Sequence, residues 1–149
     1  MTQGERFLEK CLTTNVELEP WPYQILTDTL STEVFDKLAM QCKEKFNFPT
    51  TELHHIFPKN YAEHNLDFYD ETVDICKTLL KNYKNLCERY PKYRDYPRIG
   101  INAHVSITPP LPYKFHIHQE GLEKIWSSVT YLSLIHISEP TRLLSIAYA

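Results

Sequence analysis

The residues with the most chemistry to offer lie between positions 115 and 120, where the chain reads FHIHQE. On an extended strand, side chains at positions i and i+2 point to the same face. His116, His118 and Glu120 therefore share one face of a predicted strand, and two imidazoles beside a carboxylate can hold a divalent metal ion. The His-x-Glu pattern is weak on its own, because such strings also occur on solvated strand faces.

The residues that follow extend this pattern into a longer block. Residues 124–132 read KIWSSVTYL. Together with the His-x-Glu strand, they resemble the central motif of the 2-oxoglutarate- and Fe(II)-dependent dioxygenases of the prolyl-hydroxylase-like kind. That family follows a His-x-Asp strand with the form [RK]-x-x-[ST]-x-x-x-Y-L. The likeness covers about residues 98–133 and extends to small oxygenases of phage and marine microbial origin.

The resemblance implies a metal site and two cofactors. His118 would be the first iron ligand and Glu120 the carboxylate ligand, with no catalytic residue beyond these ligands. Glutamate stands where the family usually has aspartate, which puts turnover in doubt because the side chain is one methylene longer. For His116, a position behind the metal ligands or facing solvent is favoured over ligation. The implied cofactors are Fe(II) and the co-substrate 2-oxoglutarate, and the resemblance also allows ascorbate.

Three further residues are candidates for contact with 2-oxoglutarate. His104 lies on the preceding predicted strand, and Ser127 and Tyr131 occupy motif positions. The alternative for each is a packing role within the sheet or barrel. The resemblance implies oxidation of a small-molecule or peptide substrate. The metal centre, more than the protein, would carry out this chemistry.

The end of the chain departs from the family. A distal histidine, followed by an arginine that pairs with 2-oxoglutarate, would be expected several tens of residues after Glu120. Only 29 residues follow Glu120, and their candidates are His136 and Arg142. Residues 134–149 resemble a translated sequencing adapter or library vector. We therefore interpret residues 1–133 as the N-terminal part of a dioxygenase-like domain and 134–149 as a non-native tail, and we expect an inactive chain with exposed strand edges.

The remaining sequence predicts the elements that position these residues. Residues 1–19 are a short helix or a loose arm, and residues 20–30 an edge strand leading into a turn. Apolar residues at helical spacing predict helices over 32–46, capped by Ser31 or Thr32, and over 69–90. Strict alternation predicts a strand over 99–107, and further strands are expected at 113–119 and 124–134. The fold class is α+β, with N-terminal helices packed on a partial double-stranded β-helix (jelly-roll) barrel.

Composition limits the other functions. The chain has 149 residues, a net charge of −3 and four cysteines without CxxC spacing. These features predict a cytoplasmic protein with reduced thiols, and they disfavour a nucleic-acid binder or a membrane protein. The alternative to the oxygenase is a non-enzymatic α+β binding or phage structural module, whose His-rich strand is solvated or binds zinc. For the adjacent pair His54–His55, a solvated or hydrogen-bonded role is favoured over metal binding.

Overall fold

The structure, a computed structural model, describes residues 1–19, 22–45, 54–90, 99–107 and 130. The helices in this part are α1 (Gln3–Thr13), α2 (Thr32–Lys45), α3 (Tyr69–Lys81) and α4 (Tyr83–Cys87), with a short 3-10 helix, η1 (Pro58–Asn60). Strands β1 (His54–Ile56) and β2 (Val105–Ile107) form a two-stranded sheet. This mixture agrees with the α+β class. The described residues contain no barrel, and the strands predicted at 113–119 and 124–134 lie outside them apart from residue 130.

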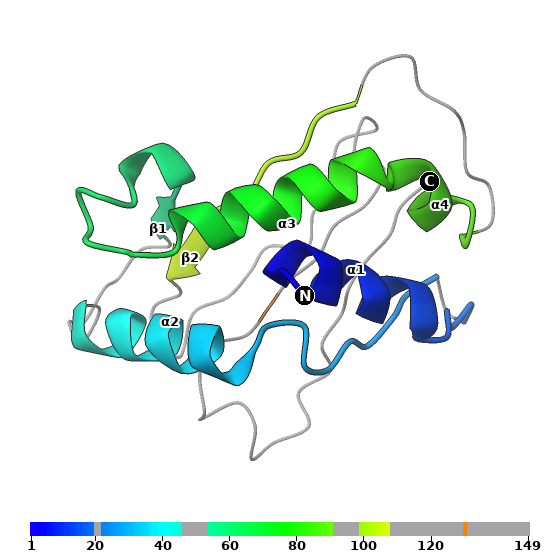
Figure 1. Ribbon diagram of the computed structural model, residues 1–149, viewed down its shortest axis with the longest axis horizontal. Coiled ribbons are helices and arrows are strands. Elements are labelled where there is room, and N and C mark those ends of the chain that lie inside the picture. Colours follow the sequence, from blue (N-terminus) through cyan, green and yellow to red (C-terminus); the bar gives the residue numbers. More distant parts are fainter. Residues whose placement is uncertain (20–21, 46–53, 91–98, 108–129, 131–149) are drawn as a thin grey trace.

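Helix α1 begins and packs through specific contacts of its first turn. The Thr2 hydroxyl accepts a hydrogen bond from the backbone N–H of Glu5, and the Glu5 carboxylate accepts one from the backbone N–H of Thr2. This capping box satisfies donors that the helix itself leaves free. The helix lies beside α3 (Figure 1), and the Gly4 N–H donates across to the Asp74 carboxylate at 2.7 Å.

Helix α2 confirms the predicted start. The Ser31 hydroxyl accepts a hydrogen bond from the Val34 N–H at 3.3 Å, as an N-cap residue should. Gln3 of α1 holds this cap in place, because its side-chain amide both donates to the Ser31 hydroxyl and accepts from the Ser31 N–H. The start of α2 is therefore tied to the start of α1.

The single helix predicted over 69–90 is wrong at its centre. Helix α3 ends at Lys81 and α4 begins at Tyr83, with Asn82 between them at φ −109° and ψ 14°. The Asn82 side-chain amide donates to the Thr78 carbonyl at 2.8 Å. Asparagine side chains compete in this way with the helical backbone. The apolar spacing continues across the break, so periodicity alone could not reveal it.

The edge strand predicted over 20–30 is also wrong in the part that is described. Between residues 22 and 30, the only ladder contact is a single bridge from Tyr23 to Glu17. The buried Gln24 instead donates its side-chain amide to the carbonyls of Cys11 and Thr14. The segment therefore closes the C-terminal end of α1, where helix carbonyls lack internal partners.

The strand predicted over 99–107 is shorter in the structure. Only Val105–Ile107 form a strand, paired antiparallel with β1 in the register His54↔Ile107, His55↔Ser106 and Ile56↔Val105. Residues 99–104 carry the same alternation without strand structure. The described partner strand is itself three residues long, so the ladder extends no further than β1 does.

Two apolar clusters form the described core. The first joins α2 and the sheet and contains Leu30, Val34, Leu38, Ile56, Tyr61, Leu66 and Phe68. The second joins α1 to α3 and α4 and contains Phe7, Cys11, Leu79 and Leu86. Ile75 of α3 packs against both. Among the described helices, none is long and apolar enough to cross a membrane.

Candidate functional site

Most of the predicted site residues fall outside the part of the chain that the structure describes. This applies to the proposed metal ligands His118 and Glu120, and to Ser127 and Tyr131. It applies equally to His116 and to the tail from 134 to 149. Of the predicted site residues, His104 alone can be placed.

His104 lies immediately before β2 and is exposed. Its ring meets the ring of His55 edge to face, with centroids 4.5 Å apart and planes at 85°. The ring of Phe57 lies 5.6 Å from the His104 ring between centroids, with planes at 52°. His104 therefore contacts the side chains of His55 and Phe57, both of which come from the β1 segment.

His55 has a defined partner of its own. Its Nδ1 lies 3.0 Å from the hydroxyl oxygen of Ser106, the residue directly opposite in the ladder. The hydrogen-bonded role favoured for this histidine is confirmed. The side chain of its neighbour His54 lies outside the described residues.

The sheet therefore has two chemically different faces. Ile56 is buried and Val105 packs against the first cluster, so this pair faces α2 and α3. Alternation along each strand sends their neighbours to the opposite face. That outer face carries exposed polar and aromatic side chains: His55, Phe57, His104 and Ser106. We call these four residues the histidine face.

The pairing of His55 with His104 was missed by sequence reasoning. The alternation over 99–107 correctly placed His104 and Ser106 on one face. No local signal identified residues 54–56 as the partner strand, because the paired residues His55 and Ser106 are 51 positions apart.

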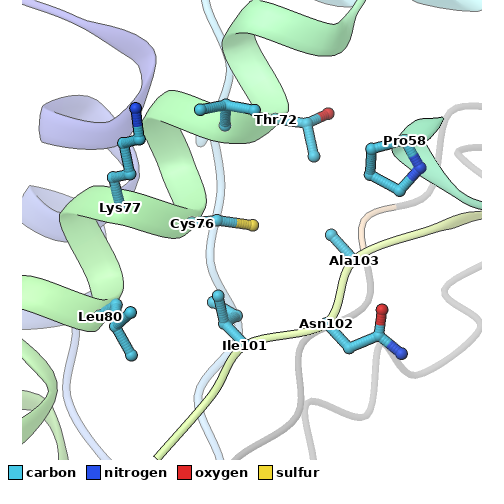
Figure 2. Close-up of a pocket in the computed structure, with 9 residues that line it drawn as sticks. Pro58, Thr72, Cys76, Lys77, Leu80, Ile101, Asn102 and Ala103 are labelled. Carbon is cyan, nitrogen blue, oxygen red and sulfur yellow. The ribbon is translucent and has the colours of Figure 1, made fainter.

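A pocket of about 230 Å³ lies beside the histidine face, between α3 and the segment that leads into β2. Figure 2 shows Cys76 pointing its sulfur toward this space, with Ile101, Asn102 and Ala103 on the far side. Pro58 closes one end. The segment 101–103 runs directly into His104, and Pro58 directly follows Phe57. Neighbouring residues of the same two segments therefore line the pocket and form the histidine face.

The pocket itself offers little reactivity. Partial burial raises the pKa of the Cys76 thiol above its ordinary value, so the sulfur stays protonated at neutral pH. A protonated thiol is a poor nucleophile and a poor metal ligand. The Thr72 hydroxyl is already engaged, since it donates to the Phe68 carbonyl at 2.8 Å. The pocket walls suit an apolar group. In the described region, the side chains best suited to chemistry are the imidazoles of His55 and His104.

The described ranges contain no group of three or more His, Cys, Asp or Glu side chains placed to hold a metal ion. Comparison with protein-family models, with curated proteins and with solved structures finds no match to this chain.

Proposed function

We propose that this chain is an Fe(II)- and 2-oxoglutarate-dependent dioxygenase in which His118 and Glu120 are metal ligands. The observation that carries the proposal is the block from 115 to 132. There the His-x-Glu strand is followed by a lysine, a serine and a Tyr-Leu pair at the spacing of the family motif.

The arrangement of the described part supports this proposal. Residues from α2 and α3 cover one face of the β1–β2 sheet, through Ile56 and Val105, and leave imidazoles on the other. Helices on one face of a sheet and polar site residues on the opposite face are what the proposed architecture requires. Strand β2 also comes before the segment with the metal-binding pattern, which begins at Phe115.

The donor set suits the proposed metal. An imidazole and a carboxylate are two of the three donors in the facial arrangement that binds non-haem Fe(II) with open positions. When bound, the metal with 2-oxoglutarate would supply the oxidising power for attack on a substrate C–H bond. The task of the protein residues is to hold that open geometry and to exclude water. Ser127 and Tyr131 are the proposed hydrogen-bonding groups for 2-oxoglutarate.

The chain by itself is proposed to be inactive. A third ligand and a guanidinium that pairs with the distal carboxylate of 2-oxoglutarate complete the family's site. Neither His136 nor Arg142 stands at the spacing that the family uses. The substrate, a small molecule or a peptide, would be oxidised only by a protein that supplies these groups.

The proposal is tested by measuring Co(II) and Fe(II) affinity, with and without 2-oxoglutarate, in the full chain and in the separate variants His118→Ala and Glu120→Ala. Each variant should weaken metal binding by at least about tenfold, because even residues that only support metal ligands cost 10- to 100-fold when removed. The matched control is His64→Ala, an exposed histidine in the turn before α3.

Unchanged metal affinity in both variants would contradict the proposal. That result would favour the rival function, a binding or structural module with a solvated His-rich strand. Metal binding that depends on both residues but does not strengthen with 2-oxoglutarate would favour the rival's zinc-binding form.

A further inference from the structure

The histidine face suggests a second metal site that is separate from residues 118 and 120. We infer that His55 and His104 together bind a divalent transition-metal ion, with Zn²⁺ as the best match. Imidazole nitrogen is a preferred ligand of zinc, and a protein-bound zinc ion can take water as a further ligand.

The imidazole rings of His55 and His104 lie close together. The two rings are in contact, with centroids 4.5 Å apart, on the exposed face of two paired strands. Because both side chains are exposed, water and a metal ion can reach them. The χ2 torsion of histidine is broad, so the His104 ring can turn a nitrogen toward an ion at Nε2 of His55 while His55 keeps its contact with Ser106.

The His55 ring is oriented by its contact with Ser106. Its Nδ1 is paired with the Ser106 hydroxyl at 3.0 Å. When Nδ1–H donates to that oxygen, the proton is absent from Nε2, whose lone pair is then available to a metal. Histidine ligands in proteins almost always donate their other ring N–H in this manner, which sets the tautomer and the ring orientation. In this tautomer, Ser106 prepares His55 for binding.

The His104 ring has an aromatic neighbour in Phe57. Phe57 lies against its ring, at 5.6 Å between centroids, and limits the positions that the imidazole can adopt. An imidazole whose movement is already limited loses less entropy when it binds. The inference assigns His104 to zinc rather than to 2-oxoglutarate, and leaves Ser127 and Tyr131 for the co-substrate.

The test uses zinc alone, titrated calorimetrically into the full chain carrying His118→Ala and Glu120→Ala. This background removes the ligands of the proposed iron site, so the two proposals succeed or fail separately. Zinc should still bind. Adding His55→Asn or His104→Asn should weaken the affinity at least about tenfold, and Ser106→Ala should weaken it by up to about tenfold as the loss of a supporting hydrogen bond. Adding His64→Asn, the control, should change nothing.

A second measurement does not depend on the variants being folded. In the chain with histidines 55 and 104 intact, zinc should shift the imidazole ¹⁵N resonances of these two residues together and with one midpoint. Zinc affinity that is equal in His55→Asn, His104→Asn and the control would overturn the inference. Ring resonances that do not move at saturating zinc would overturn it equally.

Discussion

Cys11 illustrates at the residue scale how burial changes the chemistry of a side chain. The residue is 1% exposed, and loss of solvation raises the pKa of its thiol to about 12, against a smaller opposing effect of the Arg89 guanidinium. Arg89 does not reach the sulfur as a hydrogen-bond donor in this arrangement. It donates instead to the carbonyls of Cys11 and Thr14 at the end of α1. The thiol is therefore a packing group rather than a nucleophile.

This burial predicts a loss of stability at high pH. The unfolded chain releases the Cys11 proton near its ordinary pKa of 9.0, whereas the folded chain holds it to about 12. The contribution is therefore fully present below pH 9 and is lost as the pH rises from 9 toward 12. The slope from this one thiol is at most about 1.4 kcal/mol per pH unit.

Urea unfolding at pH 8 and at pH 10 measures the effect. The free energy of unfolding should fall by about 1 kcal/mol more in the natural chain than in Cys11→Ala, whose side chain does not titrate. Cys76 and Cys87 also have raised pKa values, but they are present in both chains and cancel in the comparison. An identical pH dependence in both chains would show that burial of Cys11 does not control its ionisation.

At the scale of elements, the contact between α1 and α3 depends on the absence of a side chain at Gly4. A Cβ atom at this position would lie 2.4 Å from the Thr78 hydroxyl oxygen and 2.6 Å from the Asp74 carbonyl oxygen. The close approach also allows the Gly4 N–H to reach the Asp74 carboxylate. The two helices are thus joined at one end by packing and by a hydrogen bond that places a negative charge at the positive end of α1.

Gly4→Ala should separate the helices. We expect a loss of about 1–3 kcal/mol in the free energy of unfolding, which is typical of overpacking and exceeds the gain in helix propensity from alanine. Gly100→Ala is the matched control, because a Cβ atom there would have no neighbour within 4 Å. Denaturant unfolding followed by circular dichroism gives both values. Equal stability of the two variants would mean that α1 is not packed against α3 as described.

At the scale of the whole molecule, the described part is held together by two apolar clusters that meet at Ile75. One cluster fixes α2 against the sheet, and the other fixes α1 against α3 and α4. Ile75 packs against both, from the middle of the long helix that crosses the molecule in Figure 1. Truncation of Ile75 should therefore weaken the packing on both sides of α3.

Ile75→Ala should lower the free energy of unfolding by about 2 kcal/mol, as expected for truncation of an apolar core side chain. Unfolding should remain a single transition, since both clusters lose contacts together. Leu80→Ala, at a more exposed position of the same helix, should cost less than half as much. Two separate transitions in the Ile75→Ala chain would show that the clusters fold independently.

Local signals were sufficient to predict several elements. Capping depends on residues three or four apart, so the sequence predicts Ser31 or Thr32 as the helix cap, and the structure shows that Ser31 has this role. The 3.6-residue spacing located α3, but it could not detect the break at Asn82, where a side chain competes for the Thr78 carbonyl. The edge strand expected after residue 20 failed because Gln24 is used to close α1, a contact between segments that no periodicity encodes.

Residue types and their spacing along the chain predict which side chains can do chemistry and which of them share a face. They place His104 and Ser106 on one face of β2, and they place the His-x-Glu pattern at 118 and 120. Only the tertiary structure decided that His55 lies against His104, because strand pairing across 51 positions depends on how the helices bring the strands together. Side-chain period is a local property of the backbone, whereas pairing register is set by the burial of Ile56 and Val105 against the core.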